Sequence, residues 1–86
     1  MAETILVVED DQELRETMDA FLSGRGYKVV TSSDGWNCLR EIVVKKPDLI
    51  LMDINMPKLN GFNALDLIRV TRLTAHTPII VMSGKS

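Results

Sequence analysis

Several features that mark particular protein classes are scarce or missing in this chain. Its single cysteine, Cys38, excludes an internal disulfide framework and suits a reducing compartment. No apolar run approaches the roughly 20 residues that cross a bilayer, and residues 1–4 lack the basic and apolar regions of a signal peptide. A net charge of −2 leaves no basic surface for nucleic acid. We therefore expect a soluble, cytoplasmic protein that binds neither membranes nor nucleic acid directly.

What the chain does contain is enough apolar sequence for one small core. It has 86 residues, of which 45% are hydrophobic and 26% charged. A chain of this length buries only about two-thirds of its unfolded surface, so its stability margin is thin. Without repeats, linkers or low-complexity segments, residues 1–86 are expected to form a single domain.

Short apolar runs alternate with helical patterns along the chain. The strand-like runs are residues 5–9, 27–31, 49–53 and 79–82. Apolar residues at helical spacing lie between them, at Leu14, Met18, Phe21 and Leu22, then at Trp36, Leu39, Ile42 and Val43, and then at Phe62, Leu65 and Ile68. Acidic residues start the first helix, Gly24 and Gly26 end it, and residues 32–35 cap the second. The apolar residues of the second and third helical groups are expected to point inward. This alternation predicts an α/β fold with a doubly wound parallel sheet.

Acidic residues stand at the ends of two of these strand-like runs. The cluster Glu9-Asp10-Asp11 begins with the last residue of the first run, and Asp53 ends the third. Since parallel strands place their carboxyl ends on one edge of the sheet, these acids are expected to meet there. Carboxylates that share a crevice repel one another unless a cation lies among them. The pattern therefore indicates a divalent metal site beside one special aspartate.

Three motifs, ILVVEDD, LILMDINMPKLNG and PIIVMSG, closely resemble the receiver domain of bacterial two-component response regulators. The resemblance extends over essentially all 86 residues, with the motifs in the family's order. It implies a flavodoxin-like (CheY-like) sheet of strand order 2-1-3-4-5, truncated here after the fourth strand, so that the fourth helix, fifth strand and fifth helix are absent. It also implies a phosphoprotein of a phosphorelay, which receives its phosphoryl group from a histidine kinase or a phosphotransfer protein.

The resemblance also implies roles for individual residues. Asp53 would be the phosphoacceptor and, with Asp10, a direct ligand of Mg²⁺. Glu9 would act on the metal through water, and Asn55 would offer its backbone carbonyl. Ser83 would supply the hydroxyl that senses the phosphoryl group. Such a module is not an enzyme, beyond catalysing its own aspartyl phosphorylation and dephosphorylation.

One departure from the family leaves a second hypothesis open. The family's lysine at the end of the fifth strand has no match, and neither Lys58 nor Lys85 is assigned its role. The alternative is a truncated receiver fragment without phosphotransfer activity, which folds as a swapped or paired homo-oligomer through the exposed edge of its fourth strand. A haloacid-dehalogenase-type phosphatase is rejected, because Asn55 stands where that family needs a second acid.

Overall fold

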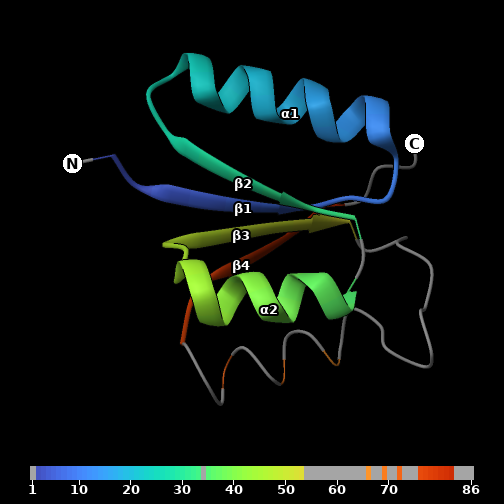
Figure 1. Cartoon of the computed structure of the whole chain (residues 1–86), viewed down its shortest axis with the longest axis vertical. Helices are drawn as coiled ribbons and strands as arrows, with labels where there is room; N and C mark the ends of the chain where they lie inside the picture. The colour runs from blue at the N-terminus through green and yellow to red at the C-terminus, as the bar shows by residue number, and fades with distance from the viewer. Residues whose placement is uncertain are drawn as a thin grey trace.

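In the part of the chain that the structure describes, four parallel strands form one sheet, with helices on both sides of it (Figure 1). The computed structural model describes residues 2–33, 35–53, 66, 69, 72 and 76–82, with the backbone alone at positions 35, 36, 53 and 82. The strands are β1 (Thr4–Val8), β2 (Lys28–Ser32), β3 (Leu49–Asp53) and β4 (Ile79–Met82). Their order, β2-β1-β3-β4, matches the first four strands of the expected order 2-1-3-4-5. The predicted fold class is confirmed.

The bounds of the first two strands differ by one residue from those expected from the sequence. β1 stops at Val8 rather than Glu9, and β2 runs from Lys28 to Ser32 rather than from 27 to 31. The N–H of Tyr27 donates to the carbonyl of Leu22, so this group belongs to the end of the preceding helix and not to the sheet. The predicted bounds of β3 and β4 agree with the structure.

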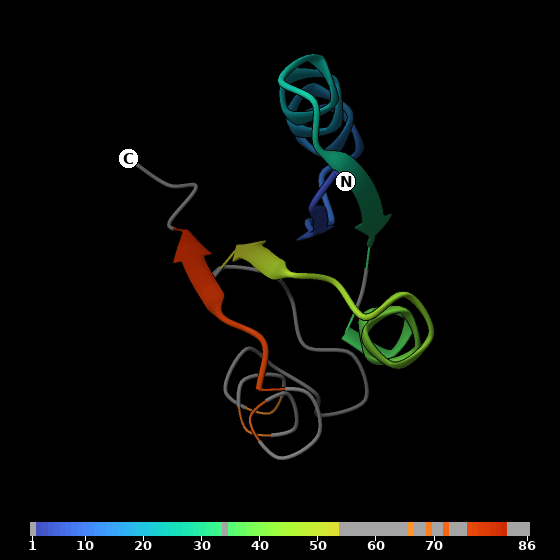
Figure 2. The same cartoon turned by 90° about the vertical axis from the view of Figure 1, so that its left-hand side faces the viewer.

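Two helices lie on opposite faces of the sheet, as Figures 1 and 2 show from two directions. They are α1 (Gln12–Gly24) and α2 (Gly35–Lys45). Asp11 caps α1 by accepting the N–H of Leu14, and Gly26 follows its end with a φ of 95°, a conformation that glycine adopts without strain. The predicted third helix is represented by residues 66, 69 and 72, which are helical, while Phe62, Leu65 and Ile68 lie outside the described residues.

The main core lies between the sheet and α2. It consists of buried side chains from β1, β3 and α2, each no more than 2% exposed, namely Leu6, Val8, Ile50, Met52, Cys38 and Ile42. Cys38 and Ile42 are four residues apart, so they share one side of the helix. Val43 lies about 100° further round the helix and is 66% exposed, so the expectation that it points inward was wrong.

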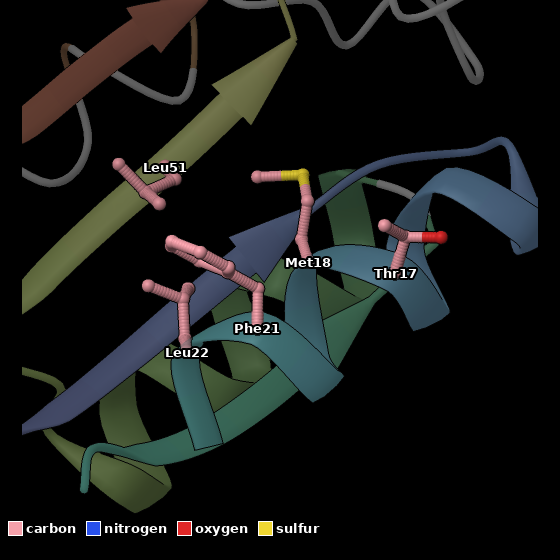
Figure 3. Close-up of a pocket in the computed structure, with 5 residues that line it drawn as sticks. All are labelled: Thr17, Met18, Phe21, Leu22 and Leu51. Carbon is pink, nitrogen blue, oxygen red and sulfur yellow. The ribbon is translucent and has the colours of Figure 1, made fainter. Parts of the chain in front are cut away.

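The other face of the sheet is less completely covered. Ile5 and Val7 are buried, but no residue of α1 is buried, and Phe21 is 58% exposed. A hollow of about 340 Å³ opens between α1 and the neighbouring part of β3. Figure 3 shows its apolar lining, which comprises Thr17, Met18, Phe21, Leu22 and Leu51.

None of the helical segments that the structure describes has the length and apolar character needed to span a bilayer.

Candidate functional site

The candidate site lies at the edge of the sheet where β1 and β3 end side by side. Val8 pairs with Met52 in the parallel register between these strands. The next residue in each chain segment is Glu9, which directly follows β1, and Asp53, which is the last residue of β3, so both stand at the same edge. On its other side the backbone of Asp53 is in register with Met82, the last residue of β4. The acids singled out in the sequence thus lie at neighbouring strand ends, although the side chain of Asp53 lies outside the described residues.

Of the acids whose side chains the structure describes at this edge, Glu9 is the most enclosed, with 2% of its surface exposed. Its N–H donates to the carbonyl of Ser32 at 3.0 Å, which extends the contact between β1 and β2 by one residue. Its Oε2 accepts the N–H of Asp11 at 3.2 Å. Withdrawing a carboxylate from water is costly unless hydrogen bonds or a cation compensate for the lost hydration. Glu9 thus brings a buried carboxylate to this edge, with the N–H of Asp11 as one of its compensating contacts.

Asp10 and Asp11 take different roles although they are adjacent. Asp10 lies in a bend with an exposed side chain, whereas the carboxylate of Asp11 caps α1 through the N–H of Leu14 at 3.1 Å. Asp11 thus has the ordinary structural role of an acidic residue at a helix start, that of the N-cap. Both side chains are exposed, but that of Asp11 is engaged at the helix start.

One contributor to this turn was not anticipated from the sequence. Arg15 donates from Nη1 to the carbonyl oxygen of Glu9 at 2.8 Å, and its backbone N–H donates to the carbonyl of Asp11 at 2.9 Å. Its side chain is half-buried. The available signal was an arginine one helical turn after the capping aspartate, a spacing that allows a long side chain to fold back over the helix start.

The donors at this edge suit Mg²⁺ in their chemistry. Glu9 and Asp10 supply hard carboxylate oxygens, one buried and one exposed. Mg²⁺ prefers such ligands and is commonly bound through one or two carboxylates, with several waters retained. Among the residues that the structure describes, no three His, Cys, Asp or Glu side chains come together as a metal-binding group. The described part of the edge therefore provides two acids, next to the backbone position of the third.

The remaining predicted site residues cannot be located in the same way. Asn55 and Ser83 lie outside the described residues, as do Lys58 and Lys85. The roles predicted for Asn55 and Ser83 remain predictions, and neither lysine was assigned one.

Comparison with known protein families gives an independent assignment. The model of the family described as "Response regulator receiver domain" matches residues 5–86. The DNA-binding response regulator MtrA of Mycobacterium tuberculosis is 35% identical over 86 residues, which make up 100% of this chain and 36% of that protein. The chain thus spans about a third of the length of such curated relatives.

Solved structures agree with the sequence comparison. The chemotaxis response regulator CheY4 of Vibrio cholerae superposes with a TM-score of 0.87 at 25% identity, over 100% of this chain and 72% of that one. The BeF3-activated N-terminal receiver domain of Klebsiella pneumoniae RstA superposes with a TM-score of 0.85 at 31% identity, over 98% and 69% of the two chains. Both similarities extend over nearly all of the present chain.

Proposed function

This chain belongs to the response regulator receiver domain family, and from that premise we propose that residues 1–86 form a phosphoacceptor unit in which Asp53 receives a phosphoryl group in the presence of Mg²⁺. The observation that carries the proposal is the register between β1 and β3. It sets the buried Glu9 and the exposed Asp10 at the same sheet edge as Asp53. The proposed donor is a phosphohistidine on a histidine kinase or a phosphotransfer protein, and the proposed compartment is the cytoplasm.

The proposed reaction is a direct transfer between two proteins. A carboxylate oxygen of Asp53 forms a bond to phosphorus as the phosphorus–nitrogen bond of the donor histidine breaks, and the electron pair of that bond returns to the imidazole nitrogen. An ionised carboxylate needs no general base for this step. A bound Mg²⁺ would neutralise the charge on the phosphoryl oxygens. In this proposal Asp10 and Asp53 are its direct ligands, together with the Asn55 carbonyl, and Glu9 acts through water.

The product has consequences for the rest of the site. An aspartyl phosphate carries more negative charge than the carboxylate that it replaces and offers additional acceptor oxygens. In the proposed function the hydroxyl of Ser83 donates to one of these oxygens and so responds to the arrival of the phosphoryl group.

Labelling with a small phosphodonor such as radiolabelled acetyl phosphate tests the acceptor assignment. We expect wild-type protein to incorporate label in the presence of Mg²⁺. When a chelator is added before the phosphodonor, we expect no incorporation. Asp53→Asn should abolish incorporation, because the amide lacks the nucleophilic oxygen anion.

A matched control stands at the opposite end of the same strand. Asp48 immediately precedes β3, and its Oδ2 accepts the N–H of Thr4 at 2.8 Å, far along the strand from the proposed site. Asp48→Asn retains an acceptor oxygen and should label like the wild type. Equal labelling of the Asp53→Asn protein would show that the acceptor is another residue.

A second candidate function is self-association through β4. Within the described residues this strand is the last of the sheet, and its side chains Ile80 and Val81 are 50% and 39% exposed. Apolar strand edges of this kind pair readily with other chains. We propose that copies of the chain associate along this edge, which predicts a mass by light scattering that rises with protein concentration. A monomeric mass at every concentration would contradict the proposal.

A further inference from the structure

We propose that Arg15 is a positioning residue for the acidic pair: it holds the peptide group between Glu9 and Asp10 so that both carboxylates are oriented toward a divalent cation. This inference rests on the proposed function, because it concerns the same metal site. It adds a residue to which the sequence patterns assigned no role.

The inference rests on a hydrogen bond from the Arg15 side chain to an earlier residue of the chain. Arg15 is the fourth residue of α1, and its Nη1 donates at 2.8 Å to the carbonyl oxygen of Glu9, six residues earlier. That carbonyl belongs to the peptide group whose N–H is that of Asp10. A planar peptide group held at its oxygen restricts ψ of Glu9 and φ of Asp10 together. These two torsions set the directions in which both acidic side chains leave the backbone.

The residues on both sides of this peptide group are fixed as well. On the strand side, the N–H of Glu9 donates to the carbonyl of Ser32 at 3.0 Å. On the helix side, the N–H of Asp11 donates to Oε2 of Glu9 at 3.2 Å, and the Asp11 carbonyl accepts the N–H of Arg15 at 2.9 Å. Asp10 is thus an exposed acid between two anchored neighbours. Ligands ordered before the metal arrives bind it more tightly, because less conformational freedom is lost on binding.

Because Arg15 is positively charged, its positioning effect on Mg²⁺ binding can be distinguished from its electrostatic effect. A guanidinium close to a cation site repels the cation, so removal of the charge alone would strengthen Mg²⁺ binding. Removal of a positioning contact would weaken it. The two effects have opposite signs, and we infer that the positioning effect is the larger.

Mg²⁺ titration calorimetry on three variants tests the inference. Arg15→Gln removes the charge and the long donor, and we expect it to weaken Mg²⁺ binding roughly tenfold, as the loss of outer-shell partners typically does. Arg15→Lys retains the charge and one donor and should recover part of the affinity. Arg25→Gln is the matched control, since it removes the same charge from the far end of α1, where the Arg25 guanidinium lies 4.7 Å from the Phe21 ring centroid. Its affinity should stay close to that of wild type, because solvent and salt screen charges at that separation.

Two further measurements separate positioning from general stability. Urea unfolding without Mg²⁺ reports the stability of each variant, and the ¹H–¹⁵N spectrum reports whether the Asp10 amide moves upon Mg²⁺ addition. We expect the Asp10 shift to shrink in Arg15→Gln while the folded spectrum is retained. If that variant does not fold, Arg15→Lys carries the same comparison.

The outcomes that overturn the inference are distinct from those that overturn the proposed function. Unchanged or tighter Mg²⁺ binding by Arg15→Gln, with wild-type binding intact, would refute the positioning role alone. A loss of stability without a loss of affinity would refute it too, because the contact would then be structural. No Mg²⁺ binding by wild type would refute the metal site and the positioning role together.

Discussion

At the scale of single residues, three neighbouring acids have three different environments. Glu9 is buried beside β2, Asp10 is exposed, and Asp11 caps a helix. The sequence predicted an acidic cluster at the end of the first strand. It could not predict which of the three acids would be buried, which exposed and which would cap the helix. Carboxylates are chemically alike, and their environments depend on where β1 ends and α1 begins. The end of β1 at Val8 differs by one residue from the predicted end at Glu9.

Replacement of the helix cap should have a measurable cost. Asp11→Ala leaves the N–H of Leu14 without its capping oxygen, and we expect the free energy of unfolding to fall by about 1 kcal/mol. Asp11→Asn keeps an acceptor at the same place and should lose much less. Urea unfolding without Mg²⁺ measures both values. Equal losses in the two variants would mean that the negative charge, rather than the hydrogen bond, stabilises the start of α1.

At the scale of elements, the helix patterns predicted the existence of α1 and α2 better than they predicted which residues would be buried. Ile42 is 2% exposed, whereas Val43, also expected to point inward, is 66% exposed. In α1 even the apolar stripe is only partly covered, since Phe21 is 58% exposed. Helical spacing identifies the side of a helix that is apolar, but the position and tilt of the helix on the sheet decide how far around that side burial extends.

Truncation of these two neighbouring residues of α2 should separate a core position from a surface position. Ile42→Ala removes a side chain packed against the sheet, and we expect a loss of about 2–4 kcal/mol in the free energy of unfolding. Val43→Ala should change the same quantity by less than about 0.5 kcal/mol. Thermal and urea unfolding of both variants provide the measurement. Comparable losses would place Val43 in an interface that forms in solution.

At the scale of the whole molecule, apolar surface gathers on the α1 side of the sheet toward β4. Leu51 of β3 pairs in register with Ile80 of β4, so their side chains point to the same face. Leu51 lines the hollow beside α1, and Ile80 is half-exposed. Parallel sheets are normally covered on both faces, which is the physical basis for the proposed self-association at this side.

A charge placed on β4 should therefore reduce self-association. Ile80→Lys introduces a residue that edge strands commonly use to prevent pairing, and we expect the concentration dependence of the mass to weaken or disappear. Val43→Lys is the control, because it places the same charge on an exposed apolar position of α2, away from β4. Light scattering across a dilution series compares the two. An equal effect in both variants would argue against an interface at β4.

The sequence by itself determined the order of strands and helices, the parallel sheet and the placement of acids at the ends of two strand-like runs. These features depend on short-range periodicity and on the connection rules of parallel sheets, both of which are encoded locally. Only the tertiary structure decided that Glu9 is buried, that Asp10 is exposed and that Arg15 binds the peptide between them. Burial, and contacts from a helix side chain to the preceding strand end, depend on how strand ends and helix starts meet in space. No periodic pattern in the sequence carries that information.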